Sequence, residues 1–164
     1  MLTIERVSWR TPRYTVRDDA GHSGLLTRRR FAEAVTGEID GDPFELRRDG
    51  RRRFTLVTAG TALATAEAAR RGRWKISVDG SAYELRRASR WRSDMELCRG
   101  AISVGSIRKG RAPRGRVLCD LPAELSPSMQ AFIGLVVQAL ESGGRERWGG
   151  GGRRGHLSAR ERGS

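Results

Sequence analysis

Arginine runs are the residues of this chain whose type and spacing best suit ligand chemistry. The chain has 32 basic residues, and all of them except Lys75 and Lys109 are arginine. A guanidinium group forms paired hydrogen bonds with phosphate oxygens, and a tryptophan between two arginines can stack on a base or lie at a lipid interface. These residues predict a surface that binds phosphate groups. The candidate ligand-binding residues are Arg28, Arg29, Arg30, Arg51, Arg52, Arg53, Arg70, Arg71, Arg73, Arg90, Trp91 and Arg92.

The net charge of +13 has two explanations that the sequence leaves open. It attracts the phosphates of anionic lipid, of a membrane surface or of nucleic acid. Alternatively, arginine at turns and on outward strand faces only keeps sheet edges soluble, and a GC-rich genome favours arginine over lysine. No segment of the chain identifies a protein partner.

Catalytic chemistry is not indicated by the other polar residues. His22 falls in a predicted turn and His156 in the C-terminal segment, so neither is placed as a fixed general base or metal ligand. The closely spaced acidic residues are typical of turns, where aspartate bonds to nearby backbone. They are Asp18, Asp19, Asp40 and Asp42. We therefore expect a non-enzymatic protein without a catalytic residue, metal or cofactor.

Cys98 and Cys119 are the two cysteines, and they form no CxxC motif. Because both lie in apolar, strand-like contexts, we expect buried thiols in a reducing compartment. Residues 1–10 hold no apolar stretch of the kind that a secretory signal needs. These features predict a cytoplasmic protein.

Short stretches of alternating, β-branched or aromatic residues, separated by glycine and aspartate turns, fill the chain up to about residue 120. Because most are joined by tight turns, the sheet is expected to be antiparallel and meandering. Several arginine runs lie beside these turns, so they can gather at one end of a barrel. The candidate strands, about twelve in number, are residues 2–9, 14–17, 24–28, 31–35, 44–48, 53–58, 61–68, 73–78, 82–87, 95–99, 102–108 and 116–120.

Asp49-Gly50 and Asp79-Gly80 predict two-residue hairpin turns, because these residue types accept the positive φ angles that such turns need. Tyr14, Phe44 and Trp74 repeat with the same spacing of thirty residues. The pattern indicates three weakly repeated hairpin units, or a chance periodicity in a turn-rich β protein. In either case the alternating aromatic and aliphatic residues should face one core.

Residues 61–69, TALATAEAA, favour a helix by composition but alternate small residues with larger ones. We interpret them as a strand, because Arg71-Gly72 then makes a turn into the next strand. Small residues on one face of a strand allow another backbone to approach closely. A helix packed inside the sheet would need such a face.

Residues 126–140 contain no charge, although 31% of the chain is charged. Ser126 can cap a helix and Pro127 suits its first position, while glycines 143 and 144 end it. The helix is apolar nearly all round, so protein should enclose it; it is shorter than the ~20 apolar residues of a membrane span. The alternative is a helix that faces lipid or a partner. The predicted core residues are Met129, Phe132, Ile133, Val136, Val137 and Leu140, leaving Gln130, Gly134 and Gln138 as a polar stripe.

The composition divides the chain into two parts. Residues 1–142 can form one folded domain, because a chain of this length can bury a substantial core. Residues 143–164 contain eight glycines and six arginines but only one sizeable aliphatic residue, Leu157. This Gly/Arg-rich tail is expected to be disordered, because it cannot bury enough apolar surface to offset its chain entropy.

About twelve short antiparallel strands followed by one enclosed apolar helix resemble the tubby C-terminal-like superfamily, which includes the LURP-one-related and phospholipid-scramblase-like families. The segments that carry the resemblance are WKISVDGSAYELRR, MELCRGAISVGSIRKG, VLCDLPAEL and SPSMQAFIGLVVQAL. The resemblance covers about residues 1–142. It implies a mainly β fold, in which a closed antiparallel β-barrel of about twelve strands encloses one C-terminal hydrophobic helix (126–141).

The resemblance also implies a function. Tubby-type members bind phosphoinositide head groups through basic residues on the barrel wall, so we expect a binding or scaffold barrel for anionic phospholipid head groups. The chain lacks the Pro-rich N-terminal region, cysteine cluster and acidic calcium loop of scramblase-like proteins, so calcium-driven lipid scrambling is not implied. The alternative is a nucleic-acid-binding protein that uses the basic surface and the Gly/Arg tail.

Overall fold

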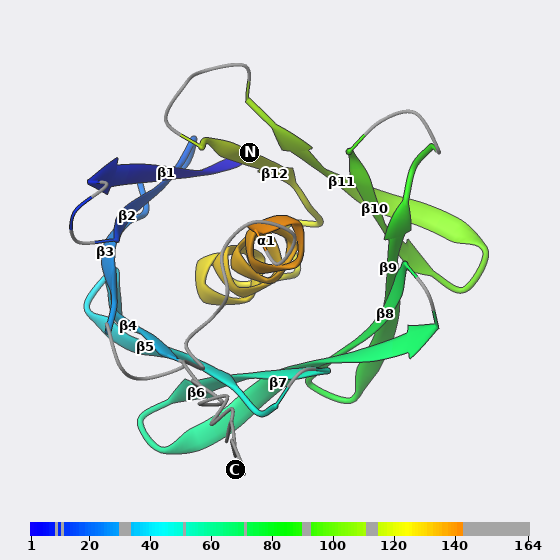
Figure 1. The fold of residues 1–164 in the computed structure, drawn as a ribbon, viewed down its shortest axis with the longest axis horizontal. Helices are drawn as coiled ribbons and strands as arrows, with labels where there is room; N and C mark the ends of the chain where they lie inside the picture. The colour runs from blue at the N-terminus through cyan, green and yellow to red at the C-terminus, as the bar shows by residue number, and fades with distance from the viewer. Residues whose placement is uncertain are drawn as a thin grey trace, which may run out of the picture.

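Alternating inward and outward residues build a closed sheet around the C-terminal helix (Figure 1). The computed structural model describes residues 1–8, 10, 12–29, 34–50, 52–70, 72–89, 93–110 and 115–142, without the side chains of residues 70, 141 and 142. The strands are β1 (Leu2–Ser8), β2 (Arg13–Asp18), β3 (Ser23–Arg28), β4 (Ala34–Ile39), β5 (Asp42–Arg48), β6 (Arg53–Thr58), β7 (Thr61–Arg70), β8 (Arg73–Val78), β9 (Ser81–Arg87), β10 (Met95–Arg99), β11 (Ile102–Lys109) and β12 (Val117–Asp120).

The strands follow one another around the barrel in chain order, and β1 closes it by pairing with β12. Every neighbouring pair is antiparallel, with register partners such as Ile4 and Val117 at the closure. Closure leaves no free sheet edge, which removes a route to aggregation. The predicted twelve-stranded antiparallel barrel is therefore confirmed.

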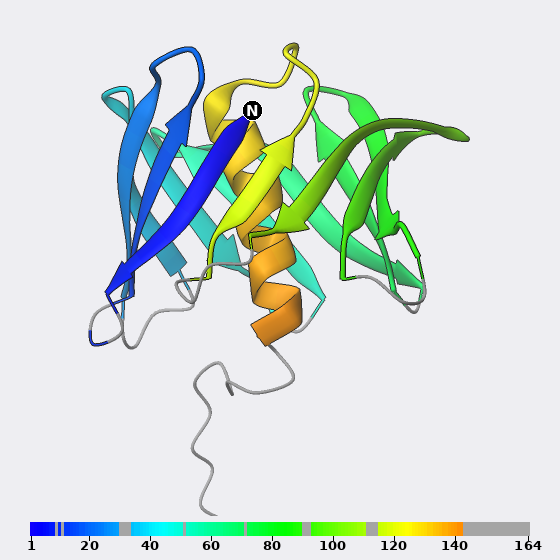
Figure 2. The same cartoon turned by 90° about the horizontal axis from the view of Figure 1, so that it is seen from above.

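The connections between strands alternate between the two ends of the barrel, because each strand reverses direction (Figure 2). The even-numbered strands end where α1 (Pro127–Ser142) begins, and the odd-numbered strands end where α1 ends. A connection that follows an odd-numbered strand thus lies at the end of the barrel where α1 ends. A connection that follows an even-numbered strand lies where α1 begins.

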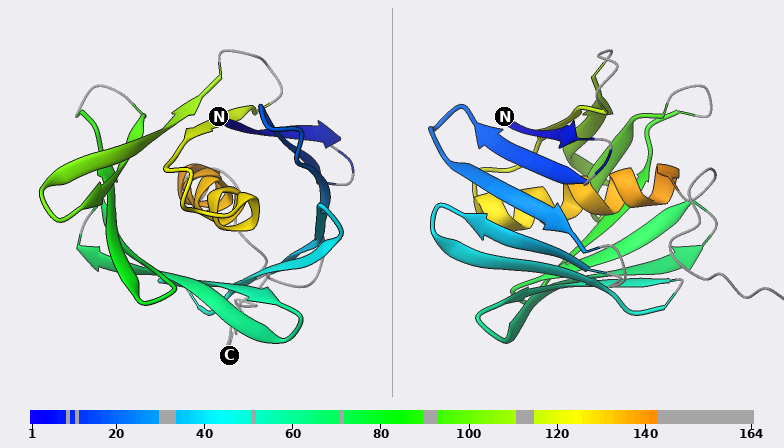
Figure 3. Two further views of the ribbon diagram at one scale, coloured as in Figure 1. Left: turned by 180° about the vertical axis from the view of Figure 1, so that it is seen from behind. Right: turned by 60° about the vertical axis from the view of Figure 1, so that its left-hand side comes forward.

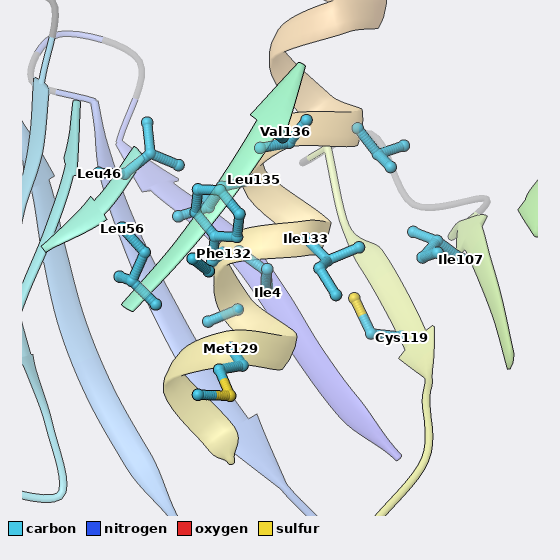
Figure 4. Close-up of a cluster of buried hydrophobic side chains, with 14 of the residues drawn as sticks. Ile4, Leu46, Leu56, Ile107, Cys119, Met129, Phe132, Ile133, Leu135 and Val136 are labelled. Carbon is cyan, nitrogen blue, oxygen red and sulfur yellow. The ribbon is translucent and has the colours of Figure 1, made fainter. Parts of the chain in front are cut away.

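The helix α1 runs through the middle of the barrel, as the two views of Figure 3 show. Its first turn is capped, since the Met129 amide donates to Ser126 Oγ at 3.3 Å. Of the predicted core residues, Leu140 is partly buried and the other five are buried. Several of them point from α1 toward Ile4, Leu46, Leu56 and Cys119 of the wall in Figure 4. Enclosure of the helix is confirmed.

Gly134 corrects the prediction of a polar stripe on α1. This glycine is buried, and a Cβ built on it would lie 2.7 Å from both Cys119 Sγ and Ile4 Cδ1. Those atoms belong to β12 and β1, so the missing side chain allows the helix to pack closely on the strands that close the barrel. Gln130 is half-buried and donates to the Leu125 carbonyl at 2.8 Å.

The strand predicted at residues 31–35 is wrong in position. Residues 31–33 lie outside the described residues, and β4 extends to Ile39. Its interior contains Gly37, where an added Cβ would lie 2.1 Å from the Leu25 carbonyl oxygen, so this glycine serves close strand packing. The turn follows at Asp40-Gly41, with φ angles of 54° and 82°.

The hairpin prediction was half right. Asp79-Gly80 is a two-residue turn with φ angles of 45° and 76°, as expected. The prediction at Asp49-Gly50 was wrong, because only Gly50 has a positive φ there and Asp49 accepts a hydrogen bond from Thr55 Oγ1 at 2.7 Å. The predicted strands 53–58 and 61–68 left Ala59-Gly60 as a tight connection, which is confirmed, although alanine gives no signal for its φ angle of 47°.

Tyr14, Phe44 and Trp74 lie on β2, β5 and β8, and each of these strands pairs with the next to form a hairpin. Strands three positions apart in an antiparallel barrel run in opposite directions, so successive units point to opposite ends. A repeat of the three units stays a prediction. All three side chains are buried, so the expectation that they face one core is confirmed.

The alanine-rich segment is strand β7, as predicted, with Ala64 and Ala66 buried. Both cysteines are buried and unbridged, in agreement with the sequence. Burial raises the pKa of the Cys119 thiol to about 12, which keeps it protonated and unreactive.

We predict that Gly134→Ala destabilises the protein by about 1–3 kcal/mol, because the new methyl group would overpack the contact with β1 and β12. In an exposed helix the same change stabilises by about 1 kcal/mol, so the sign of the change is diagnostic. Denaturant unfolding monitored by circular dichroism measures it. A variant more stable than the parent would show that α1 does not lie this close to the wall.

Candidate anion-binding end of the barrel

Basic residues are concentrated at the end of the barrel where α1 ends, which we call the basic end. Its connections are residues 8–13, 28–34, 48–53, 70–73, 87–95 and 109–117. Their charged residues with described side chains are Arg10, Arg13, Arg28, Arg29, Arg48, Asp49, Arg52, Arg53, Arg73, Arg87, Asp94, Lys109 and Arg116. Cations thus greatly outnumber the two aspartates there.

The opposite end, which we call the acidic end, has the reverse composition. Its connections are residues 18–23, 39–42, 58–61, 78–81, 99–102 and 120–126. Apart from His22, their charged side chains are Asp18, Asp19, Asp40, Asp42, Asp79, Arg99, Asp120 and Glu124. The barrel therefore has a charge dipole along its axis, and the partial negative charge at the C-terminus of α1 lies at the basic end, where it is favourable.

Five outward-facing arginines pair with carboxylates, and three of them, Arg53, Arg73 and Arg116, lie beside connections of the basic end. The pairs are Arg47 with Glu45 (2.8 Å), Arg53 with Glu67 (3.4 Å), Arg73 with Glu84 (3.5 Å), Arg86 with Glu96 (3.5 Å) and Arg116 with Glu5 (3.3 Å). Such exposed pairs add little stability, about 0–1 kcal/mol each, but they neutralise the wall.

Four exposed arginines at the tips of the basic end differ from these paired arginines. Within the described part of the chain, Arg13, Arg29, Arg52 and Arg87 form no salt bridge. Their guanidinium groups are therefore available to an external anion, which could form the paired hydrogen bonds that suit phosphate.

The structure brings the described candidate residues together. Arg28 and Arg29 lie where β3 ends, Arg52 and Arg53 between β5 and β6, and Arg70 and Arg73 between β7 and β8, all at the basic end. Arg30, Arg51, Arg71, Arg90, Trp91 and Arg92 lie outside the described residues.

Sequence reasoning missed the single basic residues of the same end. Arg13, Arg48, Lys109 and Arg116 stand alone or beside one other basic residue, so they were not selected as runs. Counting strands would have found them, because every connection that follows an odd-numbered strand lies at this end.

Three hydrogen-bonded side chains, those of Tyr83, Arg99 and Glu124, tie the segment before α1 to the wall at the acidic end. Arg99 donates to Glu124 and, at 2.6 Å, to the buried Tyr83 hydroxyl, which in turn donates to Glu124 Oε1 at 3.1 Å. The Arg99 guanidinium also lies 4.9 Å from the centre of the Tyr83 ring. Leu125, the residue after Glu124, is buried, so the segment that leads into α1 is anchored at this end of the barrel.

His22 links two turns of the acidic end. Its Nδ1 lies 2.6 Å from Asp18 Oδ2, and its Nε2 lies 3.6 Å from Asp40 Oδ2. The hydrogen bond to Asp18, followed by the nearby negative charges, raises the pKa of His22. Desolvation raises the pKa of Asp18, but the hydrogen bonds from His22 and the Ala20 amide outweigh it and lower the pKa overall.

Other kinds of site find little support in the described ranges. No group of three or more His, Cys, Asp or Glu side chains there is arranged to hold a metal ion. A hollow of about 430 Å³ lies on the outer wall over β1, β2 and the start of β12, and its lining includes Thr3, Glu5 and Arg116. The described chain has no helix of the length and apolarity needed to cross a membrane.

Comparison with known proteins finds no family model that matches this chain, and no curated protein or solved structure that is similar to it. The chemistry of the basic end is therefore the ground on which a function can be argued.

We predict that the His22–Asp18 pair makes stability depend on pH. The raised pKa of His22 adds stability below its unfolded value of about 6.5, which is lost as pH rises through the folded pKa. The lowered pKa of Asp18 adds stability above its unfolded value, which is lost as pH falls through its folded pKa. An NMR titration should give His22 a pKa above about 6.5.

Asp18→Asn should return the His22 pKa toward its ordinary value. Asp19→Asn is the matched control, because Asp19 pairs with the N-terminal amine at 2.9 Å and not with His22. An unchanged His22 titration in Asp18→Asn would contradict the pairing.

Proposed function

We propose that this protein is a non-enzymatic binding module that docks its basic end on an anionic phospholipid surface. The observation that carries the proposal is the segregation of charge, with tip arginines at one end and carboxylates at the other. A solubilising surface needs no such segregation, because interspersed charges serve it as well.

The charge segregation also defines an orientation. Each basic side chain near an anionic leaflet contributes about 1 kcal/mol, so the four tip arginines together suffice for reversible binding. The acidic end is repelled by the same surface. The barrel axis should therefore be perpendicular to the membrane surface, with the C-terminal end of α1 toward the lipid.

The aromatic residues that the structure describes favour lipid over single-stranded nucleic acid, while Trp9, Phe31 and Trp91 lie outside the described residues. Proteins that bind single strands stack bases on exposed aromatic side chains. In the described part of the basic end, the aromatic residues Tyr14, Phe54 and Trp74 are all buried and form no stacking platform. Binding to a flat charged surface needs no such platform.

The proposal extends the resemblance to the tubby C-terminal-like superfamily, whose barrels surround one helix as this one does. We also place the protein in the cytoplasm, where the leaflet of the plasma membrane is rich in anionic lipid. The docking surface is the barrel end rather than the wall, because several outward-facing arginines of the strands, such as Arg47 and Arg86, are paired with carboxylates, whereas none of the four tip arginines is.

We expect the double variant Arg29→Gln/Arg52→Gln to bind phosphatidylserine-containing vesicles about 10–30-fold more weakly than the parent chain, at about 1 kcal/mol per side chain. Cosedimentation over a salt series measures the affinity, with phosphatidylcholine vesicles as the neutral control. Neither chain should bind the neutral vesicles.

The matched control raises the net charge at the acidic end. Asp42→Asn/Asp79→Asn adds as much positive charge as the arginine variant removes, and asparagine tolerates the positive φ of residue 79. Combining all four changes restores the net charge of the parent but should leave binding weak. Recovery of binding in the combined variant would show that net charge alone acts, and would overturn docking by the basic end.

Binding that a single-stranded oligonucleotide abolishes selectively would favour the nucleic-acid alternative.

A further inference from the structure

The outer face of β1–β4 differs from the rest of the barrel wall. These strands form one side of the wall, blue to cyan in Figure 1. From β5 to β10, outward side chains form ion pairs such as Arg86 with Glu96. Within the described residues, the outward side chains of β1–β4 form such a pair only where Glu5 meets Arg116. Most of their other outward residues are uncharged, and these include Thr3, Thr15, Ser23, Leu25, Thr27 and Thr36.

Leu25 is the apolar residue at the centre of this face. Its side chain is 53% exposed, and its register partners are Thr15 on β2 and Glu38 on β4. A single exposed leucine needs no explanation by itself. Here, however, hollows of about 430 Å³ over β1 and β2 and about 740 Å³ over β2–β4 share Thr15 and Arg17 in their linings. The hollows leave room for the side chains of a partner around Leu25.

Two charges flank Leu25 on opposite sides. Arg17 lies on β2 and Glu38 on β4, both are exposed, and neither forms a salt bridge within the described ranges. Glu38 is directly beside Leu25, whereas Arg17 lies opposite Ser23, two residues further along the strands. The face is therefore positive on the β2 side of Leu25 and negative on the β4 side.

This distribution of charge makes the face self-complementary, because a two-fold axis brings the same patch of two identical chains together. An axis along β3 through Leu25 places the β2 side of one copy on the β4 side of the other. Arg17 of each copy then lies near Glu38 of the other copy, and their long side chains span the offset of about 7 Å along the strands. An axis across the strands would place Glu38 on Glu38, and like charges in contact disfavour that arrangement.

We propose that the outer face of β1–β4 is the interface of a two-fold homodimer, with Leu25 at the axis and Arg17 and Glu38 paired between the copies. We call this surface the Leu25 face. The inference does not depend on the proposed function, since none of these three residues is a tip arginine of the basic end.

The size of the Leu25 face sets the expected strength of the dimer. Four strands of six or seven residues cover about 400 Å², at about 4.8 Å between strands and about 3.3 Å per residue. Standard protein interfaces bury about 800 Å² on each partner. The dimer should therefore be reversible, with a dissociation constant in the micromolar range.

Sedimentation velocity of the full chain over a concentration series tests the dimer. The buffer should contain about 0.15 M salt, because the net charge of +13 makes the copies repel each other at low ionic strength. We expect a monomer–dimer equilibrium between about 1 and 100 μM. A chain that stays monomeric up to about 200 μM would leave the Leu25 face to a different protein and overturn the inference.

The apolar contact is tested by Leu25→Ser, with Ile102→Ser as the matched control. Ile102 is another exposed aliphatic side chain, 70% exposed, at the start of β11 on the other side of the barrel in Figure 1. Leu25→Ser should weaken the dimer at least about tenfold, because both copies lose the contact at the axis. Ile102→Ser should change the dissociation constant less than about threefold. Equal effects of the two substitutions would overturn the proposed interface.

Charge reversal tests the pairing between the copies. Arg17→Glu and Glu38→Arg should each weaken the dimer at least about tenfold, because each places like charges opposite one another. The double variant Arg17→Glu/Glu38→Arg should dimerise about as well as the parent, because the reversed pair is again complementary. If net charge alone acted, Arg17→Glu would strengthen the dimer, since it lowers the positive charge. That result, or a double variant as weak as the single ones, would contradict the pairing.

Cross-linking gives a second test that does not rely on a loss of association. Leu25→Cys places two thiols at the axis, and a bifunctional thiol reagent with a reach of about 10 Å should join them, since stacked sheets lie about 10 Å apart. The native cysteines, Cys98 and Cys119, are both buried and should not react. Ile102→Cys is the control and should give no cross-linked dimer. Thermal unfolding shows that each variant is folded, and a folded Leu25→Cys chain that dimerises without cross-linking would overturn the inference.

Discussion

Burial of one apolar helix inside a closed sheet is the constraint on which the rest of this protein depends. Phe132, Ile133 and Val136 are fully buried, and each such side chain contributes about 1.5–3 kcal/mol when it leaves water. Within the described residues the wall has no second layer, so its inward side chains have α1 and one another to cover them. Gly134 brings the helix onto β1 and β12, the pair that closes the barrel. Helix and closure are therefore expected to form together.

Enclosure of the helix also determines where charge can be placed. Inward positions are occupied by the core except near the mouths, and outward positions on the wall are largely paired. The antiparallel order sends alternate connections to opposite ends, which allows one end to become basic and the other acidic. The basic end coincides with the C-terminus of α1, where cations interact favourably with the helix dipole. The helix dipole and the proposed affinity for anions thus both favour basic residues at the end of the barrel where α1 ends.

The architecture could be predicted because its signals are local. Strand alternation, the uncharged run and the Ser126 cap each follow from neighbouring residues, and the predicted core of α1 needed no distant information. The errors arose where the local structure depends on contacts with residues that are distant in the sequence. The strand predicted at residues 31–35 stopped short of Gly37, which serves close packing between strands, and Asp49-Gly50 suggested a tight hairpin although Asp49 accepts a hydrogen bond from Thr55 Oγ1. The candidate site was predicted as separate runs of arginine along the sequence. Only the register of the sheet shows that Arg48 and Arg87 lie on the inner face of their strands.

The enclosed helix is tested most directly by placing a charge on it. Val136 is fully buried, so Val136→Asp should unfold the domain, because an unpaired buried carboxylate costs several kcal/mol against a total stability of about 5–15 kcal/mol. Ser128→Asp adds the same charge to the half-buried first turn of α1, where the helix dipole favours it, and should remain folded. Thermal unfolding of both variants decides the matter. A cooperative transition of Val136→Asp near that of the parent would contradict the enclosed helix.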